Sequence, residues 1–154
     1  MTPARVAARR VAPLIAYDCR VSGPTILVYS HRAAVREEII FAIGRRPASD
    51  LPRVNYLECA TVAEVLMAID DGAPDVAILD GEAQPVGGMG ICRQIHNEVS
   101  DPPPVILAIR RAADRWLATW SKADEVLVFP LDPVTAAETV GKVLRKLPGR
   151  LPVQ

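Results

Sequence analysis

The stretch Asp75-Val76-Ala77-Ile78-Leu79-Asp80 decides the fold of this chain. A short, unbroken apolar run of this kind is typical of a β-strand that is buried on both faces of a parallel sheet. The strand ends in a carboxylate, and a segment with several glycines leads from it into a helix. In open α/β sheets, ligands and chemistry lie beyond the carboxyl ends of the strands. Asp80 is therefore the first candidate for a functional residue.

Strand and helix patterns alternate on both sides of this stretch. Each connection is long enough for a right-handed parallel crossover. We therefore expect an α/β protein with a flavodoxin-like, doubly wound, five-stranded parallel sheet in the order 2-1-3-4-5 and five helices. The other strands are predicted at 25–29, 54–59, 105–109 and 126–128, and the helices at 33–43, 62–71, 89–97, 112–121 and 133–147.

Two helix starts have clear capping signals. Thr61 and Glu64 form the pattern of a capping box, and Asp132 followed by Pro133 is a typical N-cap and first helical residue. The spacing of apolar residues predicts that the last helix buries one face, made by Val134, Ala137, Val140, Leu144 and Leu147.

Composition limits the classes of partner. The chain has 18 basic and 18 acidic residues, so its net charge gives no broad attraction to nucleic acid or to an anionic membrane. No apolar run approaches the roughly 20 residues of a membrane span. The three cysteines, Cys19, Cys59 and Cys92, are widely spaced without a metal-site pattern, which favours reduced thiols in a cytoplasmic protein.

The ends of the chain differ from the middle. Residues 1–22 are rich in alanine and arginine, and we interpret them as a disordered arm before a domain at 23–148, with a frayed tail at 149–154. The short apolar piece at 11–16 is interrupted by proline, unlike a secretory signal. The arginines of the arm are either solvated or in contact with an acidic partner: Arg5, Arg9, Arg10 and Arg20.

Three stretches, at 26–37, 75–95 and 123–131, resemble in order and spacing the receiver domains of two-component response regulators. The resemblance covers about residues 24–148. It implies that Asp80 is the phosphoacceptor, a nucleophile that takes a phosphoryl group from a donor. It also implies a Mg²⁺ ion held by an acidic pair after the first strand, a Ser or Thr after the fourth strand, and a lysine after the fifth.

The residues around the acceptor depart from that pattern. Ser30 and His31 take the place of the acidic pair, Ile109 that of the hydroxyl, and Phe129 that of the lysine. The switch aromatic of the family is replaced by Val126 as well. Removing a single preorganised electrostatic donor costs about 2.7–4 kcal/mol of barrier, so the combined losses predict transfer slower by many powers of ten. We therefore expect no Mg²⁺ site and no cofactor.

The resulting expectation is an atypical, pseudo-receiver domain, not an enzyme, that signals by protein–protein contact without phosphorylation. Two alternatives stay open: a phosphorelay receiver that accepts phosphoryl at Asp80 by non-standard chemistry, and a small-ligand sensor with an apolar pocket beneath Ile109 and Phe129. Asp80 itself is then a relic, a structural hydrogen-bond acceptor or a rarely used phosphoacceptor. A further hypothesis pairs the imidazolium of His31 with Asp80 in place of the missing cation.

Trp116 and Trp120 lie one turn apart on the predicted fourth helix and share a face. Core packing is the default interpretation of such a pair. The alternative is an exposed aromatic contact, because the fourth helix, fifth strand and fifth helix form the surface through which receiver domains usually dimerise or meet effectors. In that case Arg110, Arg111 and Arg115 are candidates for a polar rim, and a homodimer through this face is one possible assembly.

Overall fold

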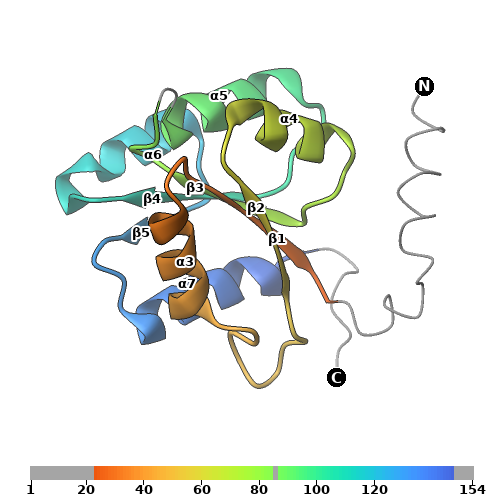
Figure 1. The fold of residues 1–154 in the computed structure, drawn as a ribbon, viewed down its shortest axis with the longest axis vertical. Coiled ribbons are helices and arrows are strands. Elements are labelled where there is room, and N and C mark those ends of the chain that lie inside the picture. Colours follow the sequence, from red (N-terminus) through yellow and green to blue (C-terminus); the bar gives the residue numbers. More distant parts are fainter. Residues whose placement is uncertain (1–22, 85–86, 148–154) are drawn as a thin grey trace.

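The computed structural model describes residues 23–84 and 87–147, which form one parallel sheet with helices on both faces (Figure 1). The predicted arm at 1–22 and tail at 149–154 lie outside the described residues. The strands are β1 (Thr25–Tyr29), β2 (Asn55–Cys59), β3 (Val76–Asp80), β4 (Val105–Ile109) and β5 (Glu125–Val128). The helices are α3 (Ala33–Ile43), α4 (Val62–Asp70), α5 (Gly88–Glu98), the 3₁₀ turn η2 (Ala112–Asp114), α6 (Arg115–Ser121) and α7 (Pro133–Arg145).

The five strands are parallel and lie in the order β2-β1-β3-β4-β5, which confirms the predicted topology. In the middle of the sheet, Val28 of β1 is paired with Ile78 of β3, and Ile78 with Ile106 of β4. Because all strands point the same way, the residues that follow β1, β3, β4 and β5 meet at one edge. This carboxyl edge contains the candidate site.

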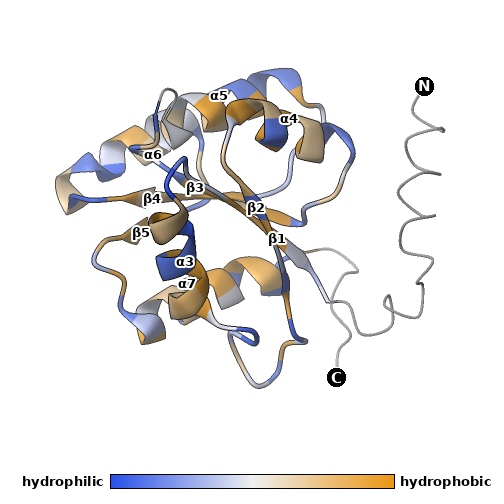
Figure 2. Ribbon diagram, in the orientation of Figure 1, coloured by the Kyte–Doolittle hydropathy of each residue, from blue (hydrophilic) through white to orange (hydrophobic). Residues whose placement is uncertain are grey.

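Two apolar layers enclose the sheet. Figure 2 shows that much of the sheet carries the colour of hydrophobic residues. One layer lies under α3 and α7, and Ile26, Ile78 and Ile106 are buried in it. The other lies under α4, α5 and α6, with Leu27, Leu79 and Leu107 at its centre. Side chains of a strand alternate between faces, so the three central strands β1, β3 and β4 contribute to both layers and are buried on both sides, whereas the edge strand β2 is partly exposed.

The predicted caps are present. Thr61 Oγ1 accepts a hydrogen bond from the backbone N–H of Glu64, whose carboxylate accepts one from the N–H of Thr61 in return. Asp132 Oδ2 accepts hydrogen bonds from the N–H and the hydroxyl of Thr135, both at 2.9 Å. These bonds satisfy backbone donors that have no partner within the helix.

Two helix predictions were wrong in detail. The predicted helix at 112–121 is divided into η2 and the shorter α6. The buried face of α7 consists of Ala136, Val140, Gly141, Val143 and Leu144. Val134, predicted to face inward, is 66 % exposed, and Ala137 is half-buried. The true stripe starts at Ala136, one position before Ala137, and this phase turns Val134 outward.

Cys59 and Cys92 are buried free thiols, as predicted, while Cys19 lies outside the described residues. No helix in the two described ranges is long and apolar enough to cross a membrane.

Candidate functional site

Asp80 ends β3 and has no exposed surface. Its Oδ2 atom accepts a hydrogen bond from the Ser30 hydroxyl at 2.8 Å, and its Oδ1 atom accepts one from the backbone N–H of Glu82 at 2.9 Å. A buried carboxylate is tolerated when its oxygens are hydrogen-bonded in this way. Burial and, secondarily, the charge of Asp80 raise the pKa of Tyr29, the last residue of β1.

Ser30 is held in place by the residues around it. Its backbone N–H donates to the carbonyl of Cys59 at 3.2 Å, and its own carbonyl accepts from Arg36 Nη1 at 2.7 Å. The hydroxyl also accepts from the N–H of Arg32 at 3.1 Å, at the start of α3. Ser30 is fully buried, so its hydroxyl is directed at Asp80 by a network that leaves it little freedom.

His31 does not pair with Asp80, so that hypothesis was wrong. The side chain is exposed, and its Nδ1 atom accepts a hydrogen bond from the backbone N–H of Gln84 at 2.9 Å. An imidazolium carries a proton on Nδ1 and cannot accept this bond. His31 therefore links the loop after β1 to the loop after β3, in the neutral form, without contacting the acceptor carboxylate.

Ile109 and Phe129 lie on opposite faces of the sheet. Ile109 belongs to the apolar layer under α5 and α6, and Phe129 to the layer under α3 and α7. The expectation of one pocket beneath both residues was therefore wrong. Phe129 is 7 % exposed, and the guanidinium of Arg110 lies 4.2 Å from the centre of its ring. This cation–π contact covers the ring at the position that the family pattern assigns to lysine.

The backbone approaches closely at the glycines that follow Asp80. Gly81 donates its N–H to the carbonyl of Ala108 at 2.8 Å. A Cβ atom on Gly88, the first residue of α5, would lie 2.7 Å from Leu79 Cβ and 2.9 Å from the carbonyl oxygen of Asp80. The lack of a side chain at Gly88 thus lets α5 begin directly against the end of β3.

The groups at the carboxyl edge do not match the ligands that Mg²⁺ prefers. Magnesium is bound by oxygen atoms in octahedral geometry, usually carboxylates and waters. Among the described residues, Asp80 is the carboxylate bonded to Ser30, and the Ser30 hydroxyl directs its proton toward it. The Nδ1 atom of His31 is occupied by Gln84. Across residues 23–84 and 87–147, no cluster of three or more His, Cys, Asp or Glu side chains is placed to hold a metal.

The two tryptophans are exposed, so the core interpretation of this pair was wrong. Trp116 is 65 % and Trp120 is 49 % exposed on α6. Arg93 of α5 lies over the Trp120 ring at 4.5 Å and donates from Nη1 to the Trp120 carbonyl at 2.6 Å. The sequence reasoning missed Arg93, because only the packing of α5 beside α6 brings it there. We call Trp116, Trp120 and Arg93 the tryptophan surface.

The three arginines predicted to surround the tryptophans have different surroundings. Arg110 stacks on Phe129, as described above, and is not part of a rim. Arg111 forms an ion pair with Asp114 at 3.1 Å. Arg115 lines a small hollow of about 190 Å³ between β5 and α7, together with Glu125 and other residues of those elements. Among the described residues, Arg93 is therefore the arginine that stacks on an indole ring.

Known proteins agree with this geometry. No protein-family model matches the chain. Relatives from two strains of Mycobacterium tuberculosis, both named uncharacterized response regulatory proteins, are 44 % identical over 120 residues, which cover 78 % of this chain and 90 % of theirs. The receiver domain of Francisella response regulator 1452 superposes with a TM-score of 0.67 at 15 % identity and covers 80 % and 98 % of the two chains.

A CheY-like response regulator receiver domain protein from Methanospirillum hungatei superposes with a TM-score of 0.64 at 15 % identity, over 81 % of this chain and 96 % of its own. At such identities the solved structures support the fold alone. The mycobacterial relatives are similar enough to define the family. The chain thus belongs to the response regulators of two-component signal transduction, and its fold is that of their receiver domain.

Proposed function

We propose that this receiver domain signals by binding a protein partner, and that phosphorylation of Asp80 plays no part. The observation that carries the proposal is the hydrogen bonding of Asp80: both carboxylate oxygens accept bonds from buried or backbone donors of the domain itself. A nucleophile needs a free lone pair that faces the donor phosphorus. One hydrogen bond to each oxygen leaves further lone pairs on the carboxylate, but the two bonds hold Asp80 in a buried position that is stable without a phosphoryl group.

Charge neutralisation is the second support. A phosphoryl group on Asp80 brings negative charge into the carboxyl edge, where it needs cations or hydrogen-bond donors. Phe129 and Ile109 supply neither. The guanidinium of Arg110 lies over the Phe129 ring, and that of Arg36 donates to the Ser30 carbonyl and pairs with Glu58. We propose accordingly that the domain has no Mg²⁺ requirement, no cofactor and no catalytic activity of its own.

The tryptophan surface is the proposed partner site. Two indoles in one helical turn, each about half exposed or more exposed than that, are unusual on a protein surface. Tryptophan and arginine are enriched among the residues that dominate binding energy. The partner we propose is a protein rather than nucleic acid or a membrane. A second copy of the chain, joined through α6, β5 and α7, is the first partner to test, by sedimentation velocity of the wild type against Trp116→Ala.

The buried free thiols of Cys59 and Cys92 fit a reducing compartment, so we place the domain in the cytoplasm. Burial raises the pKa of both thiols to about 11, which keeps them protonated and poorly reactive at neutral pH.

Incubation with a small phosphodonor and Mg²⁺, followed by intact-mass spectrometry, tests the proposal. We expect no phosphorylated species beyond the level of the Asp80→Asn variant. A triple variant, Ser30→Asp with His31→Asp and Phe129→Lys, restores the family's charged residues and serves as the positive comparison. A phosphoryl adduct on the wild type that disappears in Asp80→Asn would support the phosphorelay alternative instead.

A further inference from the structure

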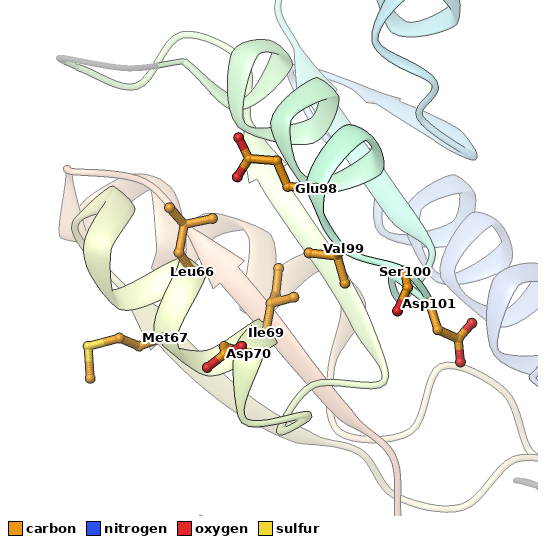
Figure 3. A pocket seen from close by; sticks show the side chains of 8 residues that line it. All are labelled: Leu66, Met67, Ile69, Asp70, Glu98, Val99, Ser100 and Asp101. Carbon is orange, nitrogen blue, oxygen red and sulfur yellow. The ribbon is translucent and has the colours of Figure 1, made fainter. Parts of the chain in front are cut away.

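A groove runs between α4 and α5 on the face of the sheet opposite α7, away from the carboxyl edge (Figure 3). It has a volume of about 660 Å³, within the range of sites that bind peptides and small molecules. It lies between the end of α4 and the segment that follows α5. Its lining residues are Leu66, Met67, Ile69, Asp70, Glu98, Val99, Ser100 and Asp101.

The groove combines an apolar wall with acidic side chains. Leu66 and Ile69 from α4 and Val99 from the opposite side lie between the two walls in Figure 3. Met67, beside them, is 66 % exposed. The charged groups of the lining, Asp70, Glu98 and Asp101, are all carboxylates, and the lining contains no lysine or arginine. Its chemistry therefore suits a segment that carries apolar side chains together with positive charge.

The chain contains such a segment directly before β1. Residues 1–22 include four arginines against a single acidic residue, Asp18. Within them, Arg9 and Arg10 precede the apolar piece Val11-Ala12-Pro13-Leu14-Ile15-Ala16, and Arg20 follows it. The segment thus has an apolar block with basic residues on both sides, which matches the apolar wall and the acidic side chains of the groove.

The topology brings the beginning of β1 to the end of the groove. Thr25 N–H donates to Asp75 Oδ2 at 2.8 Å, and Asp75 lies in the turn that follows the end of α4. The other wall ends at Asp101, and Pro104, three residues later, accepts a hydrogen bond from Ala77 of β3. Both walls of the groove therefore end at the sheet edge at which residue 23 enters the domain.

The length of the preceding segment is sufficient. Gly23 is eight positions after Ile15, and an extended chain spans about 3.3 Å per residue, or roughly 26 Å. A helix is about 10 Å in diameter with its side chains, so this reach takes Leu14 and Ile15 over the edge of the sheet and into the layer of α4 and α5.

We propose that the groove between α4 and α5 binds the chain's own N-terminal segment, with Leu14 and Ile15 on the apolar wall and the flanking arginines beside Glu98 and Asp101. The segment then covers apolar surface of α4 and α5, on a different part of the domain from the tryptophan surface. This inference does not depend on the phosphorylation state of Asp80.

Paramagnetic relaxation in the full-length chain tests the proposal. A nitroxide label is attached at Ala8→Cys in a Cys19→Ser background, where the remaining thiols of Cys59 and Cys92 are buried. Residue 8 is 15 residues from Gly23, so an unbound segment would place the label about 20 Å from that point on average, in all directions. The proposal predicts that the label broadens the amide signals of residues 66–70 and 98–101 most strongly. The amide signals of residues 46–53, which lie at the same sheet edge, should be broadened less.

Matched variants separate docking from chance proximity. Removing two charges with Glu98→Gln and Asp101→Asn should lower the docked population about threefold to tenfold, because each partly exposed ion pair contributes modestly. The control, Glu37→Gln with Glu138→Gln, removes two carboxylates from α3 and α7 on the other face and should change nothing. Leu14→Asn with Ile15→Asn should abolish the concentrated broadening.

Two results would overturn the proposal. Equal broadening at 46–53 and at the groove residues would mean that the segment samples the whole edge without docking. The second result comes from a mixed sample of ¹⁵N chain without spin label and spin-labelled ¹⁴N chain. Broadening of the groove signals in this sample would mean that the N-terminal segment of a different copy occupies the groove.

Discussion

Replacing Ser30 by alanine probes the hydrogen bond that holds Asp80 in its buried position. The variant removes the donor to Asp80 Oδ2 and the acceptor for the N–H of Arg32. Leaving a buried polar group without a partner costs about 1–3 kcal/mol, and bonds to a charged group are at the upper end of the usual range. We expect Ser30→Ala to lower the free energy of unfolding by about 1–2 kcal/mol.

A double-mutant cycle with Asp80→Asn isolates the contribution of this one bond. The asparagine keeps an acceptor for the Glu82 N–H but removes the charge, and the Ser30 hydroxyl can turn to accept from the amide. Ser30→Ala should therefore cost less in the Asp80→Asn background, with a coupling energy of about 1 kcal/mol. The loss of the Arg32 contact is common to both backgrounds and cancels.

Urea unfolding followed by circular dichroism measures the cycle. With m about 2 kcal/mol per molar urea, the expected loss for Ser30→Ala moves the midpoint by roughly 0.5–1 M. Ser121→Ala is the matched control, since its buried hydroxyl donates to the carbonyl of Ala118 at 3.0 Å and shares no partner with Asp80. A coupling energy near zero between Ser30 and Asp80, equal to that of the control, would refute the reasoning.

Three further variants, one of them with a matched control, test other parts of the structure. Gly88→Ala should cost about 1–3 kcal/mol of stability, because the added methyl group overpacks against the end of β3. The control, Gly90→Ala on the exposed side of α5, should be neutral or stabilising by up to about 1 kcal/mol. Thermal unfolding of the two variants measures the difference. Hydrogen bonds from the first turn of α7 lower the pKa of Asp132 below its ordinary value of 3.8. The charged carboxylate therefore stabilises the folded state fully above that pH, and this stabilisation is lost as the pH falls through the folded-state pKa. Asp132→Ala should thus destabilise more in urea at pH 7 than at about pH 3. Trp120→Ala should cost only about 0.5–1 kcal/mol, the value of its stacking with Arg93, and a loss of 3 kcal/mol or more in urea unfolding would show that the indole is part of the core.

The fold could be predicted because its signals are local. The unbroken apolar runs of β1, β3 and β4 have few other interpretations, and the capping residues Thr61 and Asp132 mark helix starts by chemistry that acts within four residues. The phase of α7 was harder, because adjacent Ala136 and Ala137 fit either face. The prediction chose Ala137, and with it turned Val134 to the wrong side.

The candidate site could be predicted only as a set of positions. The edge of a parallel sheet places residues 30, 80, 109 and 129 at one end of the domain, whatever side chains they carry. Which groups touch depends on side-chain directions, and these have no local sequence signal. The Ser30–Asp80 bond, the His31–Gln84 bond and the Arg110–Phe129 contact all join segments 19 or more residues apart.

The exposure of the tryptophans could not be predicted from the sequence either, because it depends on how α6 packs. Two aromatic residues one turn apart predict an apolar helix face, and such a face is usually buried. Here α6 is only seven residues long, and its buried residues are the small Ala118 and Ser121. The indoles extend from the opposite side, where no described element covers them fully.

A nitrogen–proton NMR titration of the full chain, with Mg²⁺ first and then with beryllofluoride, tests most directly whether Asp80 takes part in signalling. Beryllofluoride imitates a phosphoryl group on an acceptor carboxylate and needs the metal to bind. We predict that the amide signals of residues 30–32, 80–84 and 108–110 stay in place at millimolar Mg²⁺ and after the fluoride is added. Saturable shifts concentrated at these residues, absent in Asp80→Asn, would contradict the account and show that the carboxyl edge is a working phosphorylation site.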